Sequence, residues 1–143
     1  HLVLPASVSM FTEELGYDPR STGASYERHA AELVAAGRTY VVLDDGAGHP
    51  ALPGAPAQVA FKADIGALWA TSAQVTGVWT RPDLRGRGIA HAALAATVAR
   101  ARADHVGQAG TVSLYVNDFN TAALALYSGL GFTRVGTFAT ILL

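Results

Sequence analysis

The stretch Arg85-Gly86-Arg87-Gly88-Ile89-Ala90 joins an apolar strand pattern (75–80) to a long Ala-rich helix pattern (89–103). A glycine-rich turn before a helix directs several backbone N–H groups to one point, where the helix dipole adds about half a positive charge. Gly86 and Gly88 lack the Cβ atoms that would keep a phosphate from the backbone, and Arg85 and Arg87 add charged donors. The turn therefore predicts a phosphate or pyrophosphate site. The alternative is a tight turn with solvated arginines.

Two nucleotide-binding motifs fit this turn less well. A P-loop requires Gly-Lys-Ser/Thr after the glycines, and no such sequence follows them here. The dinucleotide fingerprint requires Gly or Ala where His91 stands, although Asp118 could mimic the ribose-binding acid of that fold. A module that binds NAD or ATP therefore remains an alternative.

A second helix pattern occupies residues 120–132, Asn-Thr-Ala-Ala-Leu-Ala-Leu-Tyr-Ser-Gly-Leu-Gly-Phe. Asn120 is typical of an N-cap, and Gly131 is typical of the left-handed position just past a helix C-terminus. Asn120 and Tyr127 are two helical turns apart, so they share one face with Ala123. Taken alone, Tyr127 is more typical of a core or boundary aromatic residue than of a catalyst.

Together these stretches resemble the GNAT superfamily of acyl-coenzyme A dependent N-acetyltransferases. The family carries Arg/Gln-x-x-Gly-x-Gly/Ala at the start of its pyrophosphate-binding helix, which reads Arg85-x-x-Gly88-x-Ala90 here. The segment Val78-Trp79-Thr80-Arg81-Pro82 stands where the family has its splayed fourth strand and a short turn. Asn120, Tyr127 and Gly131-Phe132 match the next family motif, and the resemblance covers residues 5–143.

The resemblance implies an α/β (α+β) fold. Its central sheet is mixed and mostly antiparallel, flanked by about four helices and splayed at the fourth family strand. The first family strand is not visible, because the chain opens with His1 and continues almost at once into a helix pattern. We therefore expect residues 1–143 to be a GNAT acetyltransferase domain and a C-terminal fragment of a longer polypeptide.

The resemblance also implies a reaction, in which an amine attacks the thioester of acetyl-coenzyme A directly within a ternary complex. Tyr127 would be the catalytic residue that donates a proton to the departing sulfur. The backbone of the strand end would hold the pantetheine arm, and Asn120 would hold its helix end or contact the coenzyme. The predicted coenzyme-binding residues are Val78, Trp79, Thr80, Arg85, Gly86, Arg87, Gly88, Ile89, Ala90 and Asn120.

The general base is not identified by these motifs. Histone-type members place a Glu on the fourth strand, and Gln74 stands at the comparable position, where an amide cannot usefully accept a proton. The remaining options are a water held by Gln74 and Thr76, or a carboxylate from Glu13, Glu14 or Asp64. A domain that binds acyl-coenzyme A without catalysis, as a sensor or scaffold, is the alternative to an enzyme.

Composition limits the other classes. Half of the 143 residues are hydrophobic, which argues against disorder, and no run approaches the ~20 apolar residues of a membrane span. The chain has no cysteine, and its five histidines show no metal-ligand spacing, so we expect no metal. A net charge of −1 argues against nonspecific nucleic-acid binding. The absence of a signal-peptide pattern indicates a cytoplasmic protein, and nine arginines against one lysine indicate a GC-rich bacterial source.

Charge is distributed unevenly along the chain. Residues 1–70 carry four basic and eight acidic side chains, whereas residues 71–143 carry six basic and three acidic ones. The basic half suits a polyanionic cosubstrate, and Glu13, Glu14 and Asp18 could attract a cationic amine. The alternative is that these carboxylates form an ordinary solvated helix face. The partners we expect are therefore acetyl-coenzyme A and an amine acceptor (a small molecule, a peptide, a protein N-terminus or a lysine), with a homodimer as a further option.

Apolar periodicity and turn residues predict the remaining elements. Residues 5–15 are predicted to form a helix that buries Val8, Phe11 and Leu15. We expect a bulge at Gly66 and a break in strand pairing at Gly77. A further helix is predicted at 24–36, a loop at 44–56, and strands at 39–43, 58–69, 73–80, 111–116, 132–135 and 138–142.

Overall fold

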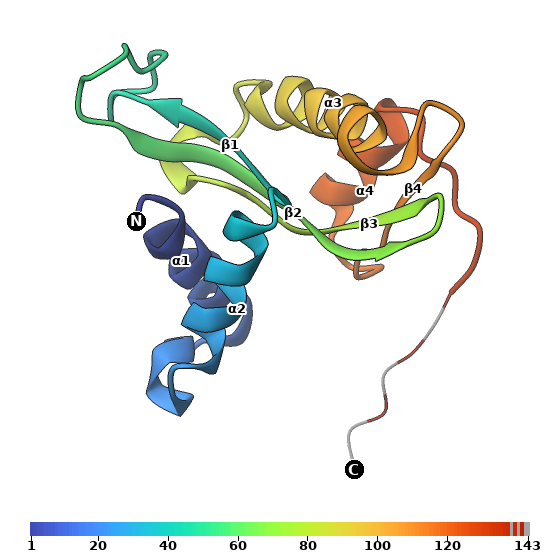
Figure 1. Ribbon diagram of the computed structural model, residues 1–143, viewed down its shortest axis with the longest axis horizontal. Helices are drawn as coiled ribbons and strands as arrows, with labels where there is room; N and C mark the ends of the chain where they lie inside the picture. The colour runs from blue at the N-terminus through green and yellow to red at the C-terminus, as the bar shows by residue number, and fades with distance from the viewer. Residues whose placement is uncertain (138, 140, 142–143) are drawn as a thin grey trace.

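A four-stranded sheet runs through the centre of the computed structural model, which describes residues 1–137, 139 and 141 (Figure 1). Its strands are β1 (Thr39–Asp44), β2 (Gln58–Trp69), β3 (Ser72–Thr80) and β4 (Thr111–Leu114). The α-helices are α1 (Val3–Leu15), α2 (Ser25–Ala35), α3 (Ile89–Ala101) and α4 (Thr121–Gly129). Three short helical turns complete the elements, namely η1 (Pro19–Thr22), η2 (Pro82–Leu84) and η3 (Arg102–Val106).

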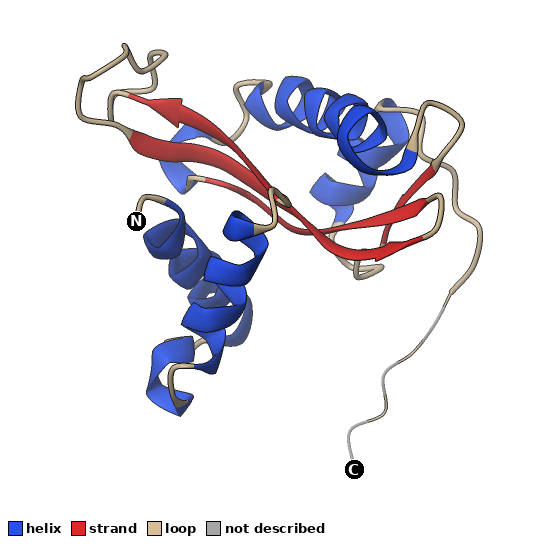
Figure 2. Cartoon of the chain, in the orientation of Figure 1, coloured by secondary structure: helices blue, strands red, loops and turns tan. Residues whose placement is uncertain are grey.

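The strands lie in the order β1-β2-β3-β4, with antiparallel pairing of β1 to β2 and of β2 to β3. β4 runs parallel to β3, and the two pair only through Ser72–Val75 and Thr111–Leu114 before they diverge. Figure 2 shows α1 and α2 on one side of the sheet and α3 and α4 on the other. The predicted mixed, mostly antiparallel sheet with four flanking helices is therefore confirmed.

Two hydrophobic cores hold the helices to the sheet. In the larger core, Phe61, Ala63 and Ile65 alternate along β2 and pack with Leu94 of α3. In the smaller core, Trp79 packs with Ala6 and Val59 beneath α1. β2 is buried over most of its length because helices cover both of its faces.

Both predicted irregularities of the central strands are present. The β2–β3 register shifts between Ile65 and Ala67, at the expected Gly66 bulge. It shifts again between Lys62 and Asp64, opposite Gly77, whose φ is +57°. This second bulge lies just after the last β3 residue that pairs with β4, so it marks the place where the sheet opens.

The predicted buried stripe of α1 is wrong. Leu15 is 54% exposed, and Val8 and Phe11 are only partly buried, whereas Ala6 and Ser7 are buried. Small residues at positions 6 and 7 let the helix approach the sheet closely. The face of α1 that meets the sheet is therefore rotated away from the bulky side chains. Phe11 instead contacts Tyr26 edge to face, with ring centroids 4.9 Å apart.

The local signals of the second helix motif are confirmed. The Asn120 side-chain oxygen accepts a hydrogen bond from the Ala123 N–H at 3.1 Å, as an N-cap does. Gly131 has φ +89°, and the Phe132 N–H donates to the Tyr127 carbonyl at 3.0 Å, which closes a Schellman motif. The helix therefore begins and ends where the sequence predicts.

The predictions at the ends of other elements need correction. The strand predicted at 111–116 ends at Leu114, because its partner β3 diverges there. The helix predicted at 89–103 changes to a π-type turn at Arg102. Residues 132–135 form no strand, and Val135 is 95% exposed without a neighbouring strand in the described part of the chain. The strand predicted at 138–142 lies outside the described residues.

Candidate functional site

The turn between η2 and α3 has the form of an anion site. Gly86 and Gly88 adopt left-handed φ angles of +76° and +79°, and Gly88 is the N-cap of α3 without any side-chain cap. The first helical hydrogen bond runs from the Ala92 N–H to the Gly88 carbonyl at 3.3 Å. The N–H groups of residues 89–91 consequently have no partner within the helix. A Cβ atom built on either glycine would meet nothing within 4 Å, so the space beside both glycines is open.

The edge of β3 beside this turn is open to a ligand. Beyond Val75 the strand no longer pairs with β4. The Arg81 N–H donates to the Ala60 carbonyl of β2 at 2.9 Å. Because backbone groups alternate in direction along a strand, those of Thr80 point away from β2, to the side where the Thr80 carbonyl accepts the Arg85 Nε–H and no described strand pairs with β3. The predicted pantetheine contacts of Thr80 thus have a backbone edge that faces the opening between the two strands.

Arg85 is already engaged in contacts within the protein. Its Nε donates to the Thr80 carbonyl at 3.0 Å, and its Nη2 donates to Oε2 of Glu13 at 2.6 Å. The side chains of Arg85 and Glu13 are 50% and 38% exposed. The sequence assigned Arg85 to the coenzyme and left Glu13 open between a base, an attraction for the amine and a solvated helix face, whereas the structure joins the two residues in one ion pair.

Trp79 is held by the same carboxylate. Its indole Nε1–H donates to Oε1 of Glu13 at 3.1 Å, and its side chain is buried under α1. Burial acts to raise the pKa of Glu13, but the hydrogen bonds from Arg85 and Trp79 outweigh it and lower the pKa. Glu13 therefore stays ionised and ties α1 to both β3 and the turn.

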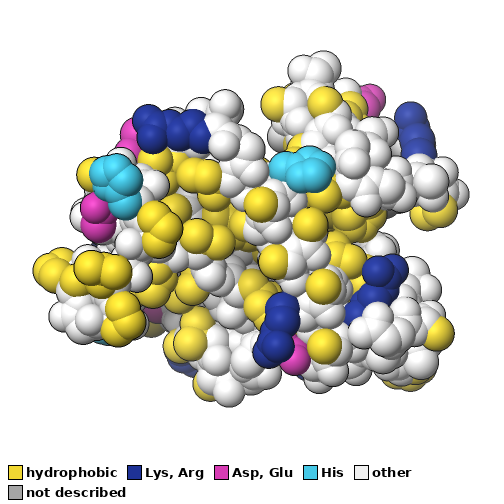
Figure 3. Space-filling view, turned by 90° about the horizontal axis from the view of Figure 1, so that it is seen from above, with side chains coloured by type: hydrophobic (Ala, Val, Ile, Leu, Met, Phe, Trp, Pro, Cys, Tyr) yellow, Lys and Arg dark blue, Asp and Glu magenta, His cyan; other side chains and the backbone are white. Residues whose placement is uncertain are grey.

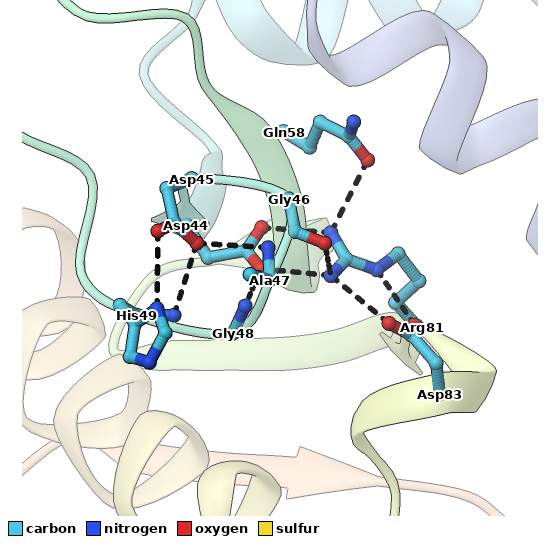
Figure 4. Close-up of polar contacts among 9 residues, drawn as sticks. All are labelled: Asp44, Asp45, Gly46, Ala47, Gly48, His49, Gln58, Arg81 and Asp83. Atoms are coloured by element: carbon cyan, nitrogen blue, oxygen red, sulfur yellow. Dashed lines mark hydrogen bonds and ion pairs between the residues drawn. The ribbon is translucent and has the colours of Figure 1, made fainter.

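A second arginine, Arg81, stabilises the approach to the turn (Figure 4). Its guanidinium is 14% exposed and makes a bidentate pair with the buried Asp44, with both N···O distances at 2.7 Å. The same guanidinium donates from Nε to Asp83 at 2.7 Å and from Nη2 to the Gly46 carbonyl at 3.2 Å. The Arg81 hydrogen bonds lower the pKa values of Asp44 and Asp83. We call Arg81, Asp44, Asp83 and the Gly46 carbonyl the Arg81 clamp; it fixes the β1–β2 loop against η2.

Arg87 and Asn120 are placed differently from Arg85. Arg87 is exposed, and among the described residues it forms no ion pair. Asn120 uses its side-chain oxygen to cap α4, which agrees with the first of its two predicted roles. Ile89 and Ala90 are half-buried in the first turn of α3, so only their N–H groups are placed to meet an anion.

Tyr127 lies on the opposite side of the opening from α1. Its ring is half-buried, partly packed against the larger core, and 6.1 Å from the Phe132 ring. Burial raises the pKa of its hydroxyl, and the charge of Glu14 raises it further. The hydroxyl therefore keeps its proton at neutral pH, as a proton donor must.

A cavity of about 180 Å³ lies on the α1 and α2 side of the sheet, at the Gly77 bulge. Its walls include Met10 of α1, Tyr26 and His29 of α2, and Asp64 and Thr76 of the strands. Of the residues considered for the general base, Asp64 and Thr76 line this cavity, whereas Gln74 does not and Glu13 is bound to Arg85. Sequence reasoning missed His29, because one histidine on a polar helix carries no local signal of a site.

Charged side chains do not gather into one large patch on the face shown in Figure 3, where basic and acidic groups are scattered among hydrophobic ones. Within residues 1–137, 139 and 141, no group of His, Asp and Glu side chains is arranged to hold a metal ion. In the same part of the chain, no helix is long and apolar enough to cross a lipid bilayer.

Residues 8–132 match the model of the acetyltransferase (GNAT) family. The chain belongs to this family. Among solved structures, an aminoglycoside N-acetyltransferase in complex with CoA is similar, with 14% identity, a TM-score of 0.68, and coverage of 97% of this chain and 87% of that one. An acetyltransferase from Trypanosoma brucei has 18% identity and a TM-score of 0.66 over 98% of this chain and 92% of its own. At these identities the likeness concerns the fold alone, and a search of curated proteins found no match.

Proposed function

We propose that this GNAT acetyltransferase is an N-acetyltransferase, which transfers the acetyl group of acetyl-coenzyme A to a primary amine by direct attack. The observation that carries the proposal is the set of unpaired N–H groups at the α3 N-terminus beside the open β3 edge. A pyrophosphate suits those donors, and an extended pantetheine arm suits a strand edge. Membership of the family and a similar enzyme in complex with CoA support the choice of cosubstrate.

In this proposal the chain positions both reactants and handles two protons. The turn from Arg85 to Ala90 binds the pyrophosphate, and the backbone of Val78 and Thr80 binds the pantetheine arm. The amine nitrogen loses a proton before attack, a carbon–nitrogen bond forms, and the carbon–sulfur bond breaks. Tyr127 supplies the proton that the departing sulfur takes up. Holding both groups in one opening lowers the barrier by several kcal/mol.

The binding step is tested by thermal unfolding with coenzyme A. A ligand at 100 times its dissociation constant stabilises a fold by about 2.7 kcal/mol, so a clear rise in Tm is expected. Gly88→Trp should abolish this rise, because the indole fills the space in front of the N–H groups. The control is Gly107→Trp, at a left-handed glycine (φ +82°) that also has open space around it but follows η3, far from the α3 N-terminus. If the intact chain shows no shift with coenzyme A, the proposal is wrong.

Turnover is tested by thiol release in a screen of amine acceptors. Tyr127→Phe should lower kcat by ~10²–10⁴-fold and leave the coenzyme-induced shift in Tm unchanged, because the hydroxyl acts in the transition state. Tyr17→Phe, at an exposed tyrosine that contacts Phe11, is the matched control and should retain full activity. Equal kcat values for Tyr127→Phe and the parent would assign Tyr127 to packing. Coenzyme A binding without turnover on any amine would instead indicate an acyl-coenzyme A sensor.

A further inference from the structure

The cavity at the Gly77 bulge combines a carboxylate with largely apolar walls. Asp64 is one of its lining residues, and Met10, Ala30 and Leu33 contribute apolar surface. Its volume is about 180 Å³. Since a cavity of about 150 Å³ holds a benzene-sized guest, this one has room for a chain of roughly six heavy atoms.

Glycine at position 77 lets the backbone of β3 pack directly against the Lys62–Asp64 pair. A Cβ atom there would lie 2.9 Å from Oδ2 of Asp64 and 3.2 Å from Nζ of Lys62. Any side chain would therefore collide with this pair. The strand that would hold the thioester, in the function proposed above, thus passes directly against the Asp64 carboxylate.

The Asp64 carboxylate is held in a fixed position. Lys62 donates a short hydrogen bond to its Oδ2, and the Thr39 hydroxyl donates to its Oδ1 at 2.7 Å. The side chains of Lys62 and Asp64 are 2% and 9% exposed. Two oxygens offer about four acceptor positions, so the carboxylate retains acceptor capacity for a nitrogen in the cavity.

His29 lines the same cavity from α2 and also reaches solvent. Among the described residues its ring forms no ion pair, so no carboxylate of that part of the chain competes with a guest for it. The other titratable or charged groups around the cavity are Tyr26 on α2, Lys62 and Asp64 on β2, and Glu14 at the end of α1, whose charge reaches Tyr26. The Tyr26 hydroxyl donates to the Ser7 carbonyl at 2.7 Å, and burial raises its pKa, so it is a poor base.

We propose that this cavity takes the end of an unbranched primary alkylamine, such as a lysine side chain, with Asp64 holding the nitrogen and His29 removing its proton. The inference rests on the proposed N-acetyltransferase function and names its acceptor class and base. One proton passes from the ammonium group to His29 and then to solvent. The neutral nitrogen bonds to the acetyl carbon as the carbon–sulfur bond breaks. The nitrogen then loses a second proton, and the departing sulfur gains one, so the protons balance.

The base is tested by kcat/KM with butylamine and Nα-blocked lysine as acceptors. His29→Gln should lower kcat/KM by at least ~10²-fold near neutral pH, because a positioned general base contributes about that much. Added imidazole should restore part of the rate. His49→Gln, at an exposed loop histidine, is the control and should match the parent.

The acceptor class is tested by comparing butylamine with cyclohexylmethylamine, whose nitrogen is equally unhindered, and with a bulky amino sugar. The parent should favour the unbranched amine by at least tenfold in kcat/KM. Because Asp64→Asn alone leaves Lys62 buried without its partner, the double variant Lys62→Met with Asp64→Asn is used. It should raise KM for butylamine by at least tenfold and keep the coenzyme-induced shift in Tm.

Three outcomes overturn the inference while leaving the proposed function intact. These are thiol release that is unchanged in His29→Gln, preference for the bulky amines, and an unchanged KM in the double variant. Failure of the proposed function is different, since no amine of any class would then release thiol from the parent.

Discussion

Arg81 and Arg85 flank η2 and differ in how deeply they are buried and in how many partners they have. Arg81 is 14% exposed and bonds to two carboxylates and a carbonyl, one carboxylate belonging to the buried Asp44. Arg85 is 50% exposed and has a single acidic partner, Glu13, which is itself partly exposed. A buried, multiply bonded guanidinium is costly to remove, whereas an exposed pair contributes little. The difference indicates that Arg81 stabilises the turn, whereas Arg85 can exchange its partner Glu13 for an anionic ligand.

Among the tests of this difference between the two arginines, Arg81→Gln should have the largest effect. Loss of the guanidinium leaves the Asp44 carboxylate buried with little compensation, which we expect to lower the free energy of unfolding by about 3–5 kcal/mol. Chemical denaturation measures this change. Arg20→Gln, which breaks the exposed Arg20–Asp18 pair, is the control and should leave the midpoint unchanged. A stability loss as small as that of the control would refute the structural role of the clamp.

The Arg81 effect should also depend on pH. The Arg81 hydrogen bonds lower the pKa of Asp44 in the folded protein below its unfolded value of about 3.9. A depressed carboxyl pKa contributes stability above the unfolded pKa and loses it as pH falls through the folded pKa. The difference between parent and Arg81→Gln should therefore be constant near neutral pH and shrink below about pH 4. A difference that grows in acid would contradict the assigned cause.

Arg85→Gln should affect binding rather than stability. A charge-assisted hydrogen bond is worth about 1.5–3 kcal/mol, so the variant should bind coenzyme A about tenfold to a hundredfold more weakly. Its own Tm should barely move, because the ion pair with Glu13 is exposed. Calorimetric titration and thermal unfolding of the same sample give both values. Unchanged affinity would mean that Arg85 serves only its contacts with Glu13 and Thr80.

The smallest effects on binding are expected from substitution of the adjacent Glu13 and Glu14, and the two variants should differ from each other. Glu13→Gln removes the competitor for Arg85, so coenzyme A should bind up to about fivefold more tightly, most clearly at low salt. Glu14 forms no ion pair among the described residues, and its charge reaches both Tyr127 and Tyr26. Glu14→Gln should therefore leave coenzyme affinity alone and raise KM for a cationic amine about twofold at low ionic strength. Equal behaviour of the two variants would show that they form one solvated face.

The predictable part of the site was the part encoded over a few residues. Gly88 at the start of α3, and Asn120 and Gly131 at the ends of α4, all have the conformations that their residue types favour. The Gly77 bulge was predictable for the same reason, since glycine inside a strand marks broken pairing. The buried face of α1 was not predictable, because several stripes of that helix are apolar. Only packing against Trp79 selects one of them.

The sequence by itself determined the mixed α/β fold and the form of the glycine turn before α3, because capping, left-handed glycines and strand periodicity depend on neighbouring residues. Only the tertiary structure decided which charges meet. Glu13 and Arg85 are 72 residues apart in the chain, and Asp44 and Arg81 are 37 apart. Such pairs depend on how α1 and the β1–β2 loop pack on the sheet, so no local sequence pattern predicts them. The cavity that His29 and Asp64 both line exists for the same reason, since its walls come from four separate elements.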